Sequence, residues 1–290
     1  MSVFRAACNR FPRKTRRLRN VISSLLHFNQ GKLKGKGVTG MELARRTDIG
    51  RVRDLNEDST GLIVTKSGAV IAIVADGMGG HQAGDVASSK TVETIEQVVS
   101  AQPLDISTDE KSDLLLHAVG KANETVYNMA AENNQYKGMG TTVIASIVDT
   151  KEVVLAHVGD SRAYMLHNGG LYQLTEDHSY VNLLKKHGQI TEEEAANHPQ
   201  RNMIVRAVGT SEEVEVDLIN TPWSQGDTLL LCSDGLTTMV SEREIGLVLS
   251  SKTMSLDEKA DQLIKMALDA GGTDNISLIL LRHTGRSATS

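Results

Sequence analysis

The alternation of hydrophobic and polar positions divides the chain into strand-like and helix-like segments. Short apolar runs, typical of strands, occupy residues 61–65, 69–75, 141–149, 152–159, 163–166, 228–233 and 276–282. Apolar residues at helical spacing recur within 92–99, 115–129 and 260–268. Helices arrive in blocks rather than after every strand. The pattern therefore favours an α+β domain with layered antiparallel sheets over a doubly wound parallel fold.

One hairpin is indicated directly by its spacing. The runs 141–149 and 152–159 are separated by Thr150 and Lys151 alone. A two-residue connection joins antiparallel neighbours, because a parallel pair needs a long crossover. These two runs are therefore expected to pair within one sheet.

Charge separates the first forty residues from the rest of the chain. Residues 1–40 contain ten Lys or Arg and no Asp or Glu, whereas the remainder carries 21 bases and 36 acids. We interpret 1–40 as a flexible basic extension and 41–290 as the folded domain. The extension also has features of a transit peptide or of a membrane-surface helix, so peripheral membrane contact stays open, as does a start at Met41. The acidic body argues against nucleic-acid binding.

Composition narrows the class of protein further. No apolar stretch approaches the roughly 20 residues that a membrane helix needs, so no transmembrane segment is expected. Cys8 and Cys232 lie far apart, and no cluster of His and Cys provides zinc-ligand spacing. A cytoplasmic location is the resulting expectation.

Acidic residues stand where several apolar runs begin or end. Asp76 follows seven apolar residues, and Asp160 and Asp234 follow two other runs. Asp274 precedes the last run, and Glu57 with Asp58 precedes the first. Each acid alone is explained by turn formation. Together they predict carboxylates that converge at one edge of the sheets, where ionising them would be costly without cations.

The ligand types indicate a hard cation. Carboxylates and waters suit Mg²⁺ or Mn²⁺, and Gly77, Gly79 and Gly80 let the backbone approach an ion closely, with the Gly77 carbonyl as a further ligand. Arg53, four residues before Glu57, is a candidate clamp for phosphate, although a surface ion pair is the plainer interpretation of one arginine. Cations beside a phosphate clamp point to hydrolysis of phosphate esters.

The motifs that carry these residues resemble a known family. "TDIGRVRDLNEDS", "VADGMGGHQAGD", "GMGTTV", "AHVGDSRAY", "LTEDHSYV", "HPQRNMIVRAVG", "LLLCSDGLT" and "GGTDNISLI" follow the order and spacing of the metal-dependent protein phosphatases (type 2C serine/threonine phosphatases), in particular their bacterial branch. The resemblance covers about residues 44–283.

The resemblance implies a fold, an activity and roles for the acids. The fold would be a four-layer α-β-β-α sandwich, and the reaction would be hydrolysis of phosphoserine and phosphothreonine by a water that two Mn²⁺ or Mg²⁺ ions activate. Asp76 would bridge both ions, Asp234 and Asp274 would complete one, and Glu57 with the Gly77 carbonyl would serve the other. The remaining implied roles are phosphate binding by Arg53, water holding by Asp58, and a weaker third metal site at Asp160 with Asp234.

Residues 178–208 resemble the family's flap beside the active site. At position 78, where many eukaryotic relatives have a histidine proposed as the general acid, this chain has Met78. His81 is a weak candidate to replace it, and a metal-bound water is the preferred proton donor.

Partners and rival functions follow from the same resemblance. Phosphorylated proteins are the expected substrates, and a Ser/Thr kinase with its substrates is a plausible signalling partner. One rival is a scaffold of the same fold without metals, and a second is a hydrolase of small phosphorylated metabolites. A cysteine-dependent phosphatase is set aside, because neither cysteine is followed six residues later by Arg.

Overall fold

The computed structural model describes residues 40–79 and 83–285 of the chain. The expectations for 1–39, for Gly80 and for His81 lie outside these residues. In the described part, no helix combines the length and the apolar character that crossing a membrane requires.

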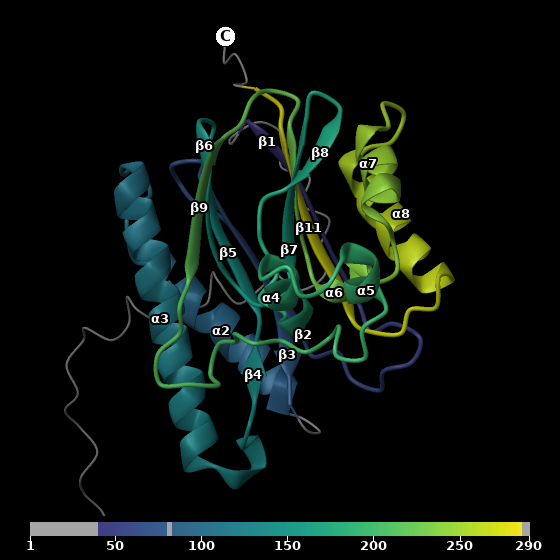
Figure 1. Ribbon diagram of the computed structural model, residues 1–290. Coiled ribbons are helices and arrows are strands. Elements are labelled where there is room, and N and C mark those ends of the chain that lie inside the picture. Colours follow the sequence, from purple (N-terminus) through teal and green to yellow (C-terminus); the bar gives the residue numbers. More distant parts are fainter. Residues whose placement is uncertain (1–39, 80–82, 286–290) are drawn as a thin grey trace, which may run out of the picture. The chain divides into compact units, whose positions relative to one another are not determined.

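Two antiparallel sheets form the centre of the fold (Figure 1). The first has the order β1-β11-β10-β7-β8, with β1 (Met41–Asp48), β7 (Arg162–His167), β8 (Gly170–Gln173), β10 (Thr228–Cys232) and β11 (Ile276–His283). The second has the order β2-β3-β5-β6-β9, with β2 (Asp58–Val64), β3 (Val70–Met78), β5 (Val143–Val148), β6 (Glu152–Val158) and β9 (Asp217–Pro222), and β4 (Gly140–Thr141) pairs with β3. The hairpin predicted from the sequence is the β5–β6 pair.

Helices cover the outer face of each sheet. Two pack on the second sheet, namely α2 (Ala83–Ser100) and α3 (Thr108–Glu132), and two on the first, namely α7 (Glu242–Ser250) and α8 (Leu256–Asp269). Shorter helices complete the list: η1 (Asn134–Tyr136), α4 (Tyr180–Lys186), α5 (Glu192–Ala196) and α6 (Asp234–Thr237). Residues 40–79 and 83–285 therefore form the predicted four layers, α-β-β-α.

Strand β3 shows why its sequence is apolar without interruption. Ile71 and Ile73 belong to the core beneath α2 and α3, whereas Val70, Ala72 and Val74 belong to the core between the sheets. Alternate side chains of a strand point to opposite faces, so a strand covered on both faces needs apolar residues at every position. Burial on both sides fixes the register of this strand firmly.

Candidate metal centre

The regular alternation along β3 places its acid. Asp76 follows Val74 by two positions and therefore points, like Val74, to the space between the sheets. Its partner on the neighbouring strand is Asp58, the first residue of β2. Two carboxyl groups thus face each other across one strand pair, an arrangement that is unfavourable when both are ionised.

The facing sheet contributes two more acids. Strand β10 ends at Cys232, Ser233 caps the short helix α6, and Asp234 is the first residue of that helix. Asp274 lies just before β11, the neighbour of β10. Because β10 and β11 are antiparallel, the end of one and the start of the other lie at the same edge, facing Asp76.

The electrostatic effects among these acids show that they lie close together. Burial raises the pKa of Asp76 well above its usual range, and Asp58, Asp234, Asp160 and Asp274 raise it further. Burial likewise raises the pKa of Asp58 to about 7. The pKa of Asp160 rises to about 8, through burial and then the charge of Asp234. Converging carboxylates therefore retain protons here unless cations neutralise them.

The hydrogen bonds within the cluster leave carboxylate oxygens available. Asp76 and Asp234 share a side-chain hydrogen bond, which requires a proton between them. Ser233 Oγ donates to Asp58 Oδ2 at 2.8 Å. Three buried carboxylate oxygens have no hydrogen-bond partner among the described residues: Glu57 Oε1, Asp58 Oδ1 and Asp160 Oδ1. A buried acceptor without a partner is costly, and this all-oxygen set fits Mg²⁺ or Mn²⁺.

Gly77 lies where no larger residue fits. A Cβ at this position would lie 2.1 Å from the carbonyl oxygen of Gly84 and 2.6 Å from that of Glu57. A Cβ on Gly84 would in turn lie 2.5 Å from Glu57 Oε1. Both neighbours of Gly77 are backbone atoms that cannot move aside cheaply. Gly77 and Gly84 therefore allow their two backbone segments to approach each other closely beside Glu57.

Arg53 lies beside the acid cluster. Its Nη2 donates to Asp274 Oδ2 at 2.8 Å, and its side chain is 46% exposed. The guanidinium has five N–H donors, and this is its one hydrogen bond within the described residues. The arginine is therefore a surface-accessible cation with free donors at the rim of the acid cluster.

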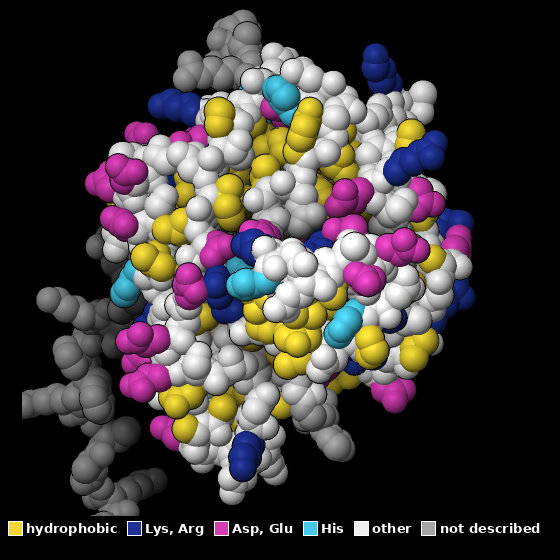
Figure 2. Space-filling model, in the orientation of Figure 1, with side chains coloured by type: hydrophobic (Ala, Val, Ile, Leu, Met, Phe, Trp, Pro, Cys, Tyr) yellow, Lys and Arg dark blue, Asp and Glu magenta, His cyan; other side chains and the backbone are white. Residues whose placement is uncertain are grey.

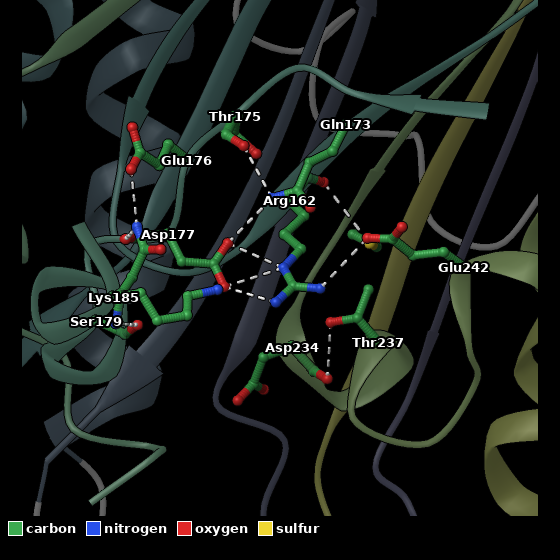
Figure 3. Close-up of polar contacts among 12 residues, drawn as sticks. Arg162, Gln173, Thr175, Glu176, Asp177, Ser179, Lys185, Asp234, Thr237 and Glu242 are labelled. Atoms are coloured by element: carbon green, nitrogen blue, oxygen red, sulfur yellow. Dashed lines mark hydrogen bonds and ion pairs between the residues drawn. The ribbon is translucent and has the colours of Figure 1, made fainter. Parts of the chain in front are cut away.

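A second arginine, which the sequence reasoning did not assign, lies behind the cluster. Figure 3 shows the guanidinium of Arg162 directed at the carboxylate of Asp177, with Asp234 nearby. Arg162 Nε donates to Asp177 Oδ1 at 2.9 Å and Nη2 donates to Oδ2 at 2.6 Å. Arg162 also acts on Asp160 and Asp234, opposing the rise in the pKa of each. It follows directly after Asp160 and Ser161 in "GDSR".

Two histidines that no sequence spacing connected lie together in the structure. Atoms of His157, His178 and Asp217 that can bind a metal lie within 4.8 Å of one another, which no other trio among the described residues achieves by the same measure. The three residues come from β6, from the segment after β8 and from β9. No local spacing in the sequence connects them.

The hydrogen bonds of His178 and Asp217 argue against a metal ion, whereas the ring nitrogens of His157 have no hydrogen-bond partner among the described residues. The Gly159 N–H donates to His178 Nδ1 at 3.0 Å, so the ring proton of neutral His178 lies on Nε2, which is 3.1 Å from Asp217 Oδ2. Arg206 Nη1 lies 2.8 Å from Asp217 Oδ1 and already supplies a positive charge. A protonated Nε2 beside a guanidinium is not a metal ligand. The trio instead anchors the start of the 178–208 segment.

Both ends of that segment are tied to the sandwich. The His178 N–H donates to the Gly159 carbonyl at 2.8 Å, and the Val205 N–H donates to the His178 carbonyl at 2.9 Å. Ser179 and Ile204 form an isolated bridge. The segment between them contains α4 and α5 and therefore projects as a closed loop from a fixed base beside Asp160.

Charges on the face of the molecule that carries α4 and α5 are mixed. Figure 2 shows acidic, basic and histidine side chains interspersed there, with exposed hydrophobic side chains above and below them. The same elements appear at the centre of Figure 1 in this orientation. The surface is therefore not a single field of one sign, in contrast to the buried acid cluster.

Comparison with known proteins identifies the class. The sequence model of the family "Protein phosphatase 2C" matches residues 50–273. The chain therefore belongs to the protein phosphatase 2C family, whose members are metal-dependent phosphatases, as the motifs implied.

Individual relatives agree with this assignment. The chain is 45% identical over 248 residues to the serine/threonine phosphatase Stp of Listeria welshimeri, covering 84% of this chain and 98% of the relative. The solved structure of the Streptococcus agalactiae serine/threonine phosphatase has a TM-score of 0.79 and 41% identity, covering 83% and 99%. A structure of the catalytic domain of the phosphatase PstP, described as a complex with two manganese ions, has a TM-score of 0.73 and 34% identity, covering 83% and 97%.

Proposed function

We propose that this chain hydrolyses phosphoserine and phosphothreonine in proteins, using two divalent cations, Mn²⁺ or Mg²⁺, at the acid cluster. One observation carries the proposal. Partnerless buried oxygens of Glu57, Asp58 and Asp160 surround a hydrogen-bonded pair of aspartic acids, and a partly exposed arginine lies at the rim. Serine/threonine phosphatases among the similar proteins support the choice of substrate.

Each acid has a proposed role. Asp76 would contact both ions, because it lies centrally among the other acids. Asp234 and Asp274 would complete one ion, and Glu57 with the Gly77 carbonyl would complete the other. Asp160, with Asp234, would form a weaker third site. Their mutual repulsion, which the raised pKa values express, is the force that cations would relieve.

When bound, the two ions would supply Lewis acidity, lowering the pKa of a nearby water so that it can attack phosphorus. The remaining tasks fall to side chains. The free donors of Arg53 would hold two oxygens of the substrate phosphate, while its bond to Asp274 keeps the guanidinium in place. Asp58 would hold the attacking water through Oδ1, because Ser233 already engages Oδ2.

Among residues 40–79 and 83–285, no side chain stands out as the donor of a proton to the leaving serine or threonine oxygen. Met78, the second residue after Asp76, cannot transfer a proton. A water near the ions would serve instead. This proposal separates the chain from relatives that have a histidine at the same place.

The remaining proposals concern the domain boundaries, the partners and the location of the protein. The catalytic domain would span 41–290, with 178–208 as a flap that influences substrate choice and 1–40 as a basic extension. A Ser/Thr kinase and its substrates are the proposed partners in signalling. A cytoplasmic location stays a prediction.

A direct assay tests the activity. Purified chain in millimolar Mn²⁺ should release phosphate from a phosphothreonine peptide, and EDTA should abolish the release. Faster turnover of sugar phosphates than of the peptide would favour a metabolite hydrolase. No release from the peptide, from sugar phosphates or from p-nitrophenyl phosphate would favour a scaffold without catalysis.

A further inference from the structure

A separate cavity lies at the end of β10 and β11 that is distant from the acid cluster. Its volume is about 370 Å³. Thr228, the first residue of β10, lines it, whereas Asp234 follows the other end of that strand. Arg282, near the end of β11, lines it, whereas Asp274 precedes the start. The turn between β7 and β8, the turn between β9 and β10, and the end of α7 form the remaining walls.

Three cationic side chains line this cavity: Lys252, Lys259 and Arg282. None of them forms an ion pair within residues 40–79 and 83–285. Lys259 is only 3% exposed, and its Nζ donates to the Leu249 carbonyl at 2.6 Å, near the end of α7. A buried ammonium normally has a carboxylate partner, because burial without one is costly. Here a single carbonyl oxygen stands in its place.

The nearby acids compensate the charge of these cations only in part. Asp227 is the one carboxylate in the cavity wall, and its oxygens already accept from the Ser224 N–H at 2.7 Å and lie 2.9 and 3.0 Å from His167 Nδ1. Glu42 is the cross-strand partner of Arg282 and is exposed outside the cavity wall.

The electrostatics of Lys259 agree with an excess of positive charge. Burial lowers the pKa of Lys259, and the charge of Arg282 lowers it further. The charge of Glu42 opposes this decrease, and the pKa nevertheless stays below its usual value. An anion placed between these side chains would therefore stabilise both charges.

We infer that this cavity binds a small phosphate-bearing anion, either inorganic phosphate or a phosphomonoester of a small molecule. Three cations can donate charge-assisted hydrogen bonds to the oxygens of a phosphate group, which carries up to two negative charges. Asn168, Gln225, Ser250 and Ser251 also line the wall, and the amide nitrogens of Asn168 and Gln225 each keep one N–H beyond their contacts with His167 and Thr284. The volume lies within the range of small-molecule sites and leaves space for the organic part of an ester. This site is independent of the catalytic proposal, and its occupancy does not require metal ions.

Isothermal titration calorimetry of the full chain tests the site. The protein is kept in EDTA and carries Arg53→Ala, so that the acid cluster and its arginine do not capture phosphate. Inorganic phosphate, glucose 6-phosphate and glucose are titrated separately at pH 7. We expect one site for a phosphate compound and none for glucose. Similar affinities for the two phosphate compounds would indicate inorganic phosphate as the ligand, and a tenfold preference for the ester would indicate a small phosphorylated molecule.

Variants assign the binding to this cavity. The double substitution Lys252→Gln and Arg282→Gln, at two less buried positions, should weaken binding at least tenfold while preserving the fold, as judged by circular dichroism. Lys265→Gln is the matched control, because Lys265 is an exposed lysine on α8 whose partner is Asp269. Absence of binding by both phosphate compounds, or binding that the double substitution leaves unchanged, would overturn the inference.

Discussion

The two ends of β10 and β11 carry opposite charges in different settings. At one end, Asp234 and Asp274 join acids of the other sheet in a cluster where burial and neighbouring carboxylates raise the pKa of Asp76 and of Asp234. At the other end, Lys259 and Arg282 line a cavity, and Lys259 is held by a helix carbonyl. The same pair of strands thus supports both a site for cations and a candidate site for anions.

The two ends of β10 and β11 differ in how the repulsion between like charges is relieved. Burial raises the pKa of Asp58 and Asp160 to about 7 and about 8, which favours their protonated forms when no cation is present. The bases instead border open space that an anion can enter. Antiparallel pairing brings the end of one strand to the start of its neighbour, so each edge gathers side chains from distant parts of the sequence. The chemistry of each site is therefore set at strand ends, and the apolar strands between them provide a rigid frame.

The largest expected effect comes from removing one charge at the acid end. Asp76→Asn should reduce kcat by about 1000-fold or more in saturating Mn²⁺, because the central carboxylate that binds the cations is lost. Steady-state hydrolysis of a phosphothreonine peptide measures the change. Asp113→Asn, an exposed acid on α3, is the control and should retain full activity. A kcat for Asp76→Asn near that of the control would remove Asp76 from the catalytic role.

A smaller effect is expected from replacing Arg53, the arginine beside the acid cluster. Arg53→Ala should raise KM by roughly 10- to 100-fold and change kcat less, because it removes phosphate binding while the acids stay in place. Arg53→Lys should recover only part of the loss, since an ammonium cannot form the same two parallel hydrogen bonds. Initial rates over a range of peptide concentrations separate the two parameters. An unaltered KM together with a reduced kcat would contradict this role.

The third prediction concerns pH and stability without metal ions. The pKa values of Asp58 and Asp160 rise to about 7 and about 8 in the folded chain. A carboxyl with a raised pKa contributes its full stability below its unfolded pKa and loses that contribution as the pH increases through the folded value. The Tm of EDTA-treated protein should therefore decrease by about 5 °C or more between pH 5 and pH 8.

Adding Mn²⁺ should raise this Tm more at pH 8 than at pH 5, because protons compete with the ion for the same oxygens. Differential scanning calorimetry measures both trends. The variant Asp160→Asn serves as the control and should show a smaller decrease with pH. An equal Mn²⁺ effect at the two pH values would show that the acid cluster is not where the ion binds.

The hydrophobic pattern predicted the buried strands and the layered architecture. Strands β3, β10 and β11 are apolar because helices cover one face and the other sheet covers the second. Strands β1 and β9 escaped detection, since each lies at the edge of its sheet and has few or no fully buried positions. Pro222 ends β9, as suits an edge strand.

The acids of the candidate site could be identified from their positions next to apolar runs. The neighbouring residues could not, because their contacts depend on long-range packing. Asp76 and Asp234 each stand directly after or within a few residues of an apolar run, so position alone singled them out. His157 and His178 meet only because β6 and the segment after β8 are adjacent in space. The role of Arg162 depends on Asp177, fifteen residues away. Long-range packing determines such contacts, and no sequence period records them.

The pairing of β1 with β11 has a consequence for how the protein matures. Their register runs from Met41 opposite His283 to Asp48 opposite Ile276. Strand β1 therefore cannot pair until β11, which is synthesised more than two hundred residues later, has been made. Closing so long a loop is slow compared with forming local contacts. On the ribosome, the unfinished domain would therefore lack both this pairing and Asp274, and phosphatase activity would begin only after synthesis has passed β11.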